Sequence, residues 1–210
     1  FAHKSVQEYW MKKSNFAVME NSGGLSTYLK QKIAVTKVAV IGNEADKLIA
    51  QAIGRLGFVN VATTPDSHNL PQCDVAICTC TEKEDYKAVI TRYDHAGIPV
   101  ICTFNFGIGA CVTVVMPGTV QPHFLKDKAD NDTVKSMLEY TSGYSIFWHI
   151  PRNSWVEEAM KYICSPEVSA SIGKYTMTAM AAHLLIAIVA GNKVKTYPKF
   201  YLSTIANDIN

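Results

Sequence analysis

Short apolar runs separated by helix-like segments dominate the chain between residues 37 and 118. Strands buried on both faces have this continuous apolar character, and helices connect such strands in α/β proteins. The runs are KVAVI (37–41), FVNVATT (58–64), DVAICTC (74–80) and PVICTF (99–104). Their alternation with helical segments predicts a Rossmann-like, doubly wound α/β fold with a mostly parallel sheet.

The connecting segments have helical signals. Before Gly57, apolar residues recur at helical spacing, and the glycine then ends the predicted helix: Leu48, Ile49, Ala52, Ile53 and Leu56. The segment TEKEDYKAVITRYDHAG (81–97) places acidic residues in a first helical turn, where they favour the helix N-terminus, and Gly97 ends it. Both segments therefore read as crossover helices.

The end of the sheet departs from this pattern. Only residues 105–109 separate the fourth run from ACVTVVM (110–116), which is room for a loop and no helix. These two strands are therefore predicted to pair antiparallel. An apolar helix over residues 176–190 and a closing strand, TYPKFYLSTI (196–205), are expected to complete the sheet.

Length and composition predict one domain, since 210 residues with 48% hydrophobic content supply a sizeable core. We divide the chain into an N-terminal arm (1–36), a Rossmann-like core (37–118), a polar and aromatic excursion (119–164) and a C-terminal helix and strand (165–210). The last part is expected to complete the same domain as the core.

The bulk chemistry excludes several classes of function. A formal charge of +2 gives little attraction to nucleic acid. The six cysteines form no CxxC pair and lie mostly in apolar runs, so we expect no metal site and a reducing intracellular compartment, either cytoplasm or an organelle matrix such as the mitochondrial one. The run 176–190 is shorter than the about 20 residues of a membrane span, which predicts a buried helix and no transmembrane segment.

The turn after the first strand decides whether a nucleotide pocket is present. A dinucleotide fingerprint needs three glycines, whereas Gly42 is followed by Asn43, Glu44, Ala45 and Asp46. Like charges about 4 Å apart repel by about 4 kcal/mol at an effective dielectric constant of about 20, so two carboxylates oppose a bound phosphate. Stabilisation of the helix N-terminus explains both carboxylates more simply, because negative charge compensates that end of the helix dipole.

Four stretches carry a resemblance to a known family. They are GGLSTYLKQKIAVTKVAVIG, TTPDSHNLPQ, DVAICTCTEKEDYKAVITRYDHAGIPVICTFNFGIGACVTVVMPGT and AAHLLIAIVAGNKVKTYPKFYL. Together they resemble the ThiF/MoeB/HesA family, the activating enzymes of ubiquitin-like and sulfur-carrier proteins. The resemblance covers roughly two thirds of the chain and is strongest from Asp74 to Gly118.

The resemblance implies binding of ATP and Mg²⁺ and adenylation of the C-terminal carboxylate of a small carrier protein. Its nucleotide-binding candidates here are Gly42, Asp66, Asn69 and Glu82. The chain departs from the family pattern at Pro71, which replaces an arginine, and at Thr81, which replaces the metal-binding aspartate. The segment between Gln72 and Asp74, which in the family holds a phosphate-binding lysine, is a single cysteine. We therefore expect a degenerate, non-catalytic member that needs no cofactor.

Such a domain is expected to act through protein partners, in a multisubunit complex or a homodimer. The partner-binding candidates lie in the glycine loop and the aromatic excursion: Asn105, Phe106, Phe147, Trp148 and Trp155. Local packing is the competing interpretation of these aromatic residues.

Two enzymatic alternatives stay open. One is a minimal adenylating enzyme, or half of one, which would bind ATP and Mg²⁺. The other is a divergent Rossmann oxidoreductase, for which the scattered His68, His95 and His149 offer no convincing catalytic partner. Cys78 and Cys80 face one side of a buried strand and read as packing residues.

Overall fold

A computed structural model describes residues 26–43, 45–120, 122–125, 132–147, 154–165 and 172–204, without the side chains of 144–147 and 154. Helices and strands alternate through the first half of the chain, as expected. The elements are α2 (Thr27–Val35), β1 (Lys37–Ile41), α3 (Asp46–Arg55), β2 (Asn60–Thr64), β3 (Val75–Cys78), α4 (Lys83–His95), β4 (Val100–Asn105), β5 (Gly109–Val115), the 3₁₀ turn η1 (His123–Leu125), α5 (Thr133–Phe147), α6 (Ser154–Cys164), α7 (Ile172–Val189) and β6 (Tyr201–Thr204).

The strands form one six-stranded sheet in the order β2-β1-β3-β4-β5-β6. The first four strands are parallel, and β5 and β6 are added antiparallel. The predicted Rossmann-like fold with antiparallel additions is therefore confirmed. The chain steps from β1 outward to β2 and then back to β3, so the direction of winding reverses between β1 and β3. In doubly wound proteins, ligands bind outside the carboxyl ends of the strands at this reversal.

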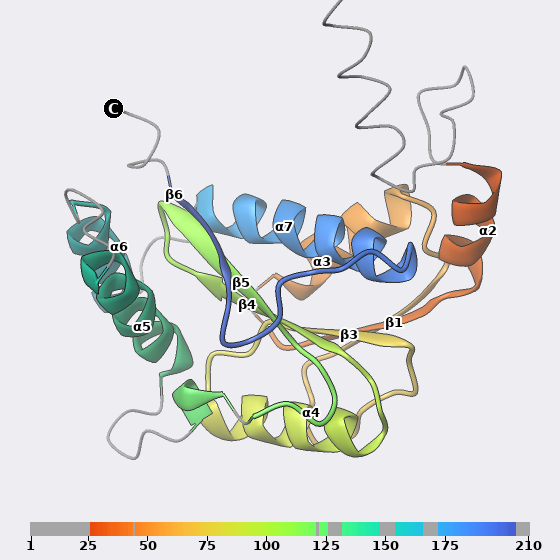
Figure 1. Cartoon of the computed structure of the whole chain (residues 1–210), viewed down its shortest axis with the longest axis horizontal. Coiled ribbons are helices and arrows are strands. Elements are labelled where there is room, and N and C mark those ends of the chain that lie inside the picture. The colour runs from red at the N-terminus through yellow and green to blue at the C-terminus, as the bar shows by residue number, and fades with distance from the viewer. Residues whose placement is uncertain are drawn as a thin grey trace, which may run out of the picture.

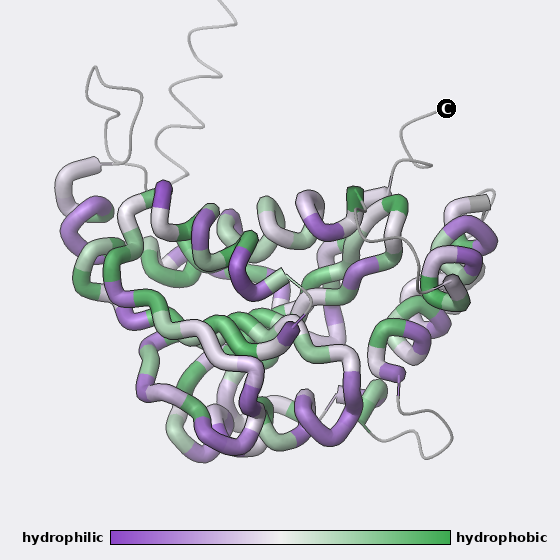
Figure 2. Tube along the Cα trace, turned by 180° about the vertical axis from the view of Figure 1, so that it is seen from behind, coloured by the Kyte–Doolittle hydropathy of each residue, from purple (hydrophilic) through white to green (hydrophobic). Residues whose placement is uncertain are grey.

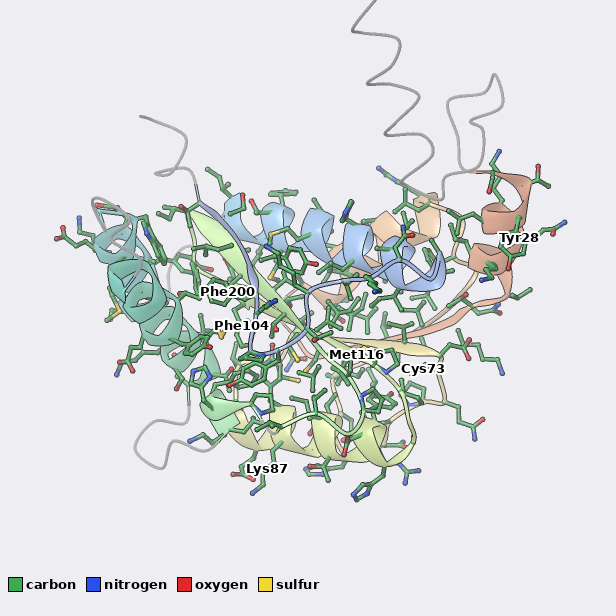
Figure 3. The ribbon with its side chains drawn as sticks, viewed as in Figure 1. Tyr28, Cys73, Lys87, Phe104, Met116 and Phe200 are labelled. Atoms are coloured by element: carbon green, nitrogen blue, oxygen red, sulfur yellow. The ribbon has the colours of Figure 1, made fainter. Side chains whose placement is uncertain are left out.

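Helices cover both faces of the sheet (Figure 1). Helices α2, α3 and α7 lie on one face, α4 and η1 lie on the other, and α5 and α6 stand together at one end of the molecule. Figure 2 shows hydrophobic strands enclosed between helices that turn hydrophilic residues outward, and Figure 3 shows Lys87 of α4 projecting away from the sheet. The sheet is thus the middle layer of three.

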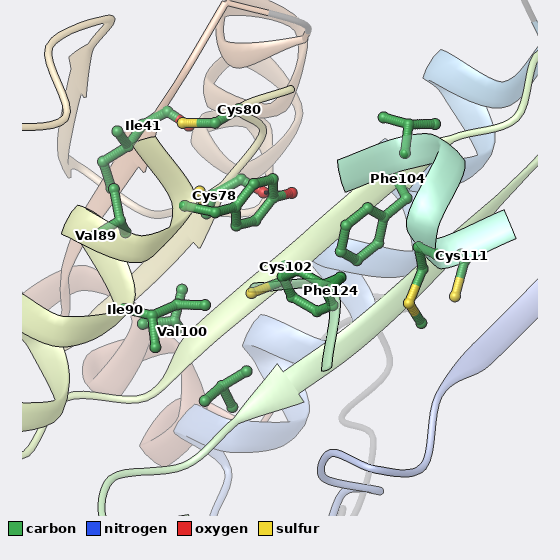
Figure 4. Packing of buried hydrophobic residues seen from close by; sticks show 14 of the residues in the cluster. Ile41, Cys78, Cys80, Val89, Ile90, Val100, Cys102, Phe104, Cys111 and Phe124 are labelled. Carbon is green, nitrogen blue, oxygen red and sulfur yellow. Dashed lines mark hydrogen bonds between the residues drawn. The ribbon is translucent and has the colours of Figure 1, made fainter. Parts of the chain in front are cut away.

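Alternation along the strands divides the core in two. Val38 and Val40 of β1 pack with α3 and α7, while Ala39 and Ile41 pack on the α4 side, as the two-residue period of a strand requires. The α4 side is rich in aromatic rings and sulfur atoms (Figure 4). The Phe104 ring stacks on that of Tyr86, with centroids 5.4 Å apart, and both meet the edge of Phe124.

The predicted apolar helix is α7. It is long and apolar enough to cross a membrane by length and composition, with a mean hydropathy of 1.5, and 39% of its residues are buried. Met177, Ala181 and Leu185 are buried in the core on the α3 side of the sheet. The remaining residues leave a partly exposed apolar face.

Two elements differ from expectation. The closing strand is shorter than residues 196–205: Thr196 makes only an isolated bridge to Val114, and the strand begins at Tyr201. Pro198 lies between, and proline cannot donate to a sheet ladder. Helix α5 lies in the segment that was expected to be a polar and aromatic excursion, and Val134, Met137, Leu138 and Thr141 are buried at helical spacing along it.

Candidate functional site

The carboxyl ends of the parallel strands β1, β2, β3 and β4 lie at one edge of the sheet, called here the carboxyl edge. Ile41 is in register with both Thr64 and Cys78. Beyond these residues, the Gly42 amide donates to the Thr64 carbonyl oxygen at 3.0 Å, and the Thr79 amide donates to the Ile41 carbonyl oxygen at 2.7 Å. Three turns are therefore tied together where a nucleotide would bind in a related fold.

Gly42 is required by the packing of this edge. Its φ is +121°, a conformation that favours glycine, and a Cβ atom would lie 2.7 Å from both the Thr79 hydroxyl oxygen and the Cys80 amide nitrogen. The Thr79 hydroxyl in turn donates to the Ile41 carbonyl oxygen at 3.3 Å. The turn that would carry a phosphate loop instead rests directly on the end of β3, which explains this glycine without a ligand.

The turn after β2 is held by its own side chains. The Asp66 carboxylate accepts a hydrogen bond from the His68 amide at 2.8 Å, closing a local turn. Ser67 is buried and donates its hydroxyl proton to the Asp85 carboxylate at 2.6 Å, which fixes the turn to α4. Asp66 follows two residues after Thr64, whose carbonyl oxygen accepts from the Gly42 amide, and both Asp66 and Asn69 are exposed.

The N-terminus of α5 contacts the segment that follows β3. The amide and the hydroxyl of Thr133 both donate to the Thr81 carbonyl oxygen, at 3.1 and 2.8 Å. Glu82 forms an antiparallel bridge with Asp132, whose carboxylate accepts from the Val134 amide and so caps the helix. The nucleotide-binding candidate Glu82 is thus placed beside a second carboxylate, and like charges at such a position oppose a bound phosphate.

A lysine at this edge was not among the predicted site residues. Lys83, in the first turn of α4, is only 8% exposed. It shares the inward face of the helix with Tyr86 and Ile90, which follow at spacings of three and seven. Lysine buries its aliphatic stem more readily than its ammonium group. The helical periodicity of residues 83, 86 and 90 was the signal that could have revealed it.

The buried cysteines have the electrostatics of packing residues. Cys78, Cys102 and Cys111 are fully buried, and burial raises the pKa of each thiol. A thiol in this state stays protonated at neutral pH and is a poor nucleophile or metal ligand. Among the residues that the structure describes, no three histidine, cysteine or acidic side chains are grouped so that they could hold a metal ion.

The loop between β4 and β5 is enclosed. Asn105 accepts from the Gly107 amide through its side-chain oxygen and donates to the Tyr162 hydroxyl through its side-chain nitrogen, both at 2.9 Å. The Gly173 amide, at the start of α7, donates to the Gly107 carbonyl oxygen at 2.7 Å. The carboxyl end of β4 is therefore covered by α6 and α7.

Three of the predicted partner-binding residues are consequently not on the surface. Asn105, Phe106 and Trp155 are 4%, 0% and 1% exposed, and the Phe106 and Trp155 rings stack with centroids 6.2 Å apart. The expectation that they are exposed was wrong, because helices from later in the chain cover the loop, and the competing interpretation of local packing describes Trp155. The Phe147 side chain and all of Trp148 lie outside the described residues.

Comparisons with known proteins identify the fold of the chain but no family. A scan against protein-family models finds no match, and a search of the curated proteins finds none. Among solved structures, the crystal structure of selenomethionine PaaA aligns with a TM-score of 0.55 at 11% identity, over 98% of this chain and 81% of that chain. E. coli MccB aligns with a TM-score of 0.52 at 11% identity, over 96% of this chain and 76% of its own.

The structure of E. coli MccB with ATP aligns with a TM-score of 0.54 at 10% identity, over 96% of this chain and 78% of that chain. Similarity at such low identity reports on the fold and leaves the site to be judged from its own residues. The chain has a Rossmann-like fold that is distantly related in structure to PaaA and MccB.

Proposed function

We propose that this chain is a catalytically degenerate ThiF-like domain that acts as a non-catalytic, protein-binding subunit of a larger assembly. One observation carries the proposal: segments of the chain itself pack against the ends of β1, β3 and β4 at the carboxyl edge. Thr79 and Cys80 rest on Gly42, Thr133 caps Thr81, and α6 and α7 cover the end of β4.

The charges at this edge support the same proposal. Adenylation requires cationic groups that neutralise the phosphates and a metal that bridges them. The carboxylates of Asp46, Asp66 and Glu82 follow β1, β2 and β3, and Pro71 and Thr81 stand where the family has an arginine and an aspartate. Phosphates at this edge would meet negative charge, which opposes the chemistry of the family.

The fold neighbours support a role in binding protein. E. coli MccB has been solved with ATP, and also with AMPCPP and MccA. For that protein, the same general fold holds both a nucleotide and a second molecule, MccA. In the present chain we propose that binding of a protein partner is retained and that nucleotide chemistry is lost.

Isothermal titration of the chain with ATP and Mg²⁺ tests this proposal, with E. coli MccB as the positive control. The expected result is no saturable heat with the chain and clear binding with the control. Micromolar affinity for ATP would overturn the proposal. Light scattering on the native protein as purified from its source is expected to show a stoichiometric assembly, whereas a free monomer carrying nucleotide would contradict it.

A second candidate function is a minimal adenylating enzyme, or half of one, and Lys83 is the observation that favours it. This lysine lies at the carboxyl edge beside Glu82 and would supply one positive charge for a phosphate. ATP–pyrophosphate exchange, measured with candidate carrier proteins and with Lys83→Met as the matched variant, separates the two functions. Exchange that depends on Lys83 would establish the adenylating activity. If no exchange occurs with any carrier protein, the protein-binding function is supported instead.

A further inference from the structure

In the described part of the chain, β6 is the last strand of the sheet. One side of β6 pairs with β5, from Tyr201 opposite Val112 to Thr204 opposite Gly109. Within the described part of the chain no strand lies beyond it, so β6 ends the sheet. Alternate residues of such a strand direct their N–H and C=O groups away from the partner strand. An edge of this kind is a template on which an extended segment of another chain can pair.

A groove runs beside this edge, between β6 and α7. Its volume is about 250 Å³, and it is lined by Ala179, Met180, His183, Leu184 and Tyr201. Small-molecule sites usually measure about 300–1,000 Å³, so the groove is better suited to a single anchoring side chain than to a whole ligand. Its lining from Ala179, Met180, Leu184 and the Tyr201 ring favours an apolar anchor.

A basic hollow of about 540 Å³ adjoins the groove and shares Tyr201 with it. Lys193, Lys195 and Lys199 are among its lining residues and are exposed. The Lys195 ammonium nitrogen lies 5.2 Å from the centroid of the Tyr201 ring, and the Lys195 amide donates to the Tyr201 hydroxyl at 2.7 Å. Neither hollow has an acidic residue in its lining, so the combined surface is positively charged.

We propose that β6 and α7 bind an extended, acidic segment of a partner protein. The segment adds a strand to the outer edge of β6, seats one apolar side chain against Met180, and places carboxylates near the three lysines. This inference rests on the proposed protein-binding function and names its site and the chemistry of its partner. Main-chain pairing contributes affinity in such complexes, and the groove and charges contribute specificity.

The positive charge of this surface also argues against two other binding partners. A second copy of the chain paired through β6 would set the same lysine-rich surface against itself across a two-fold axis, which is unfavourable. The N-terminal residues 1–25 have as their charged side chains Lys4, Glu8, Lys12, Lys13 and Glu20. This segment is therefore slightly basic and does not complement the surface. An acidic segment of another protein does.

The test is a selection from a displayed library of random ten-residue peptides on the full chain, followed by fluorescence anisotropy with the enriched peptides carrying fluorescein. The expected peptides combine acidic residues with an apolar anchor and bind with micromolar affinity. Met180→Glu is expected to weaken binding at least tenfold, and the double variant Lys193→Glu/Lys199→Glu at least fivefold. Methylation of alternate peptide amides is expected to abolish binding. Lys87→Glu, on the exposed side of α4, is the matched control and is expected to leave it unchanged.

Several outcomes would overturn the inference. The first is that the selected peptides lack acidic residues or an apolar anchor. The second is that the peptides bind the Met180 and lysine variants as tightly as they bind the parent chain. The third is that light scattering shows a dimer that Met180→Glu dissociates. Binding to vesicles of phosphatidylserine and phosphatidylcholine that is lost in the same variants would assign the surface to lipid instead. If the chain binds no peptide, does not bind ATP and is still found in a stoichiometric assembly, only this site is refuted. If the chain binds ATP, the proposed function is refuted.

Discussion

Gly173→Ala is the substitution that best tests whether the carboxyl end of β4 is closed. Gly173 lies in the first turn of α7 and donates its amide hydrogen to the Gly107 carbonyl oxygen at 2.7 Å. A Cβ atom at this position would overlap the side-chain oxygen of Asn105 and the carbonyl oxygen of Gly109. The helix and the loop must therefore move apart to accommodate even a methyl group.

The size of the effect follows from two costs. Overpacking of a well-packed site costs about 1–3 kcal/mol, and an unsatisfied buried hydrogen-bonding group costs about 1–3 kcal/mol. Against these, replacing glycine by alanine in a helix gains roughly 0.5–1 kcal/mol. Gly173→Ala is therefore expected to lower the free energy of unfolding by about 1–5 kcal/mol.

Gly54→Ala is the matched control. Gly54 lies in the last turn of α3, is exposed, and has nothing within 4 Å of the position that a Cβ atom would take. This variant should therefore raise the free energy of unfolding by at most about 1 kcal/mol, the gain for alanine over glycine in the middle of a helix. Urea unfolding followed by far-ultraviolet circular dichroism measures both variants. If Gly173→Ala is as stable as Gly54→Ala, the loop is not held under α7 and the closed edge is refuted.

Further predictions concern the core and the edge. Above about pH 9 the thiols of the unfolded chain ionise, while burial raises the pKa of Cys111 and keeps it protonated in the folded chain. The folded state then binds more protons than the unfolded state, so the free energy of unfolding falls as the pH rises. The fall is roughly 1 kcal/mol per buried thiol between about pH 9 and 10. Urea unfolding of Cys111→Ala should show a fall that is smaller by this amount. Trp155→Ala removes a ring stacked on Phe106 and should lower the free energy of unfolding by about 3–5 kcal/mol in the same assay, an effect that an exposed tryptophan would not give. Gly42→Ala should destabilise by more than about 1 kcal/mol because of its positive φ and its contact with Thr79, and a thermal midpoint equal to that of the parent chain would contradict this.

The parallel half of the sheet was predictable because of how it is buried. β1, β3 and β4 are buried along almost their whole length, and strands covered on both faces need apolar residues at every position. The antiparallel turn to β5 followed from the five residues between the two runs. Local length and local composition were sufficient for these elements.

The closure of the site was not predictable, because it depends on residues far apart in the sequence. Thr81 is capped by Thr133, and Asn105 bonds to Tyr162. A glycine-containing loop usually indicates an exposed turn, but Gly107 instead lets the backbone pass close to the Tyr162 ring. Only the folded chain distinguishes a glycine needed for close approach from a glycine in a free turn.

Helix α5 was missed for a different reason. Its sequence, TVKSMLEYTSGYSIF, contains threonine, serine and glycine, which have modest or low helix propensity. The buried face from Val134 to Thr141 stabilises it through tertiary packing. Its composition led to the description of residues 119–164 as a polar and aromatic excursion, whereas the spacing of its buried residues indicates a helix.

The burial of β5 has a consequence for the synthesis of the chain. All seven of its residues are buried, and Val112 and Val114 lie in the part of the core to which α7 contributes. Helix α7 begins only at Ile172, long after β5 ends at Val115. At about 5–20 residues per second, the ribosome needs roughly 3–10 s to make the intervening segment. During that interval the newly made β4–β5 hairpin has one apolar face without its cover, and transiently exposed apolar surface of this kind makes a nascent chain prone to aggregation.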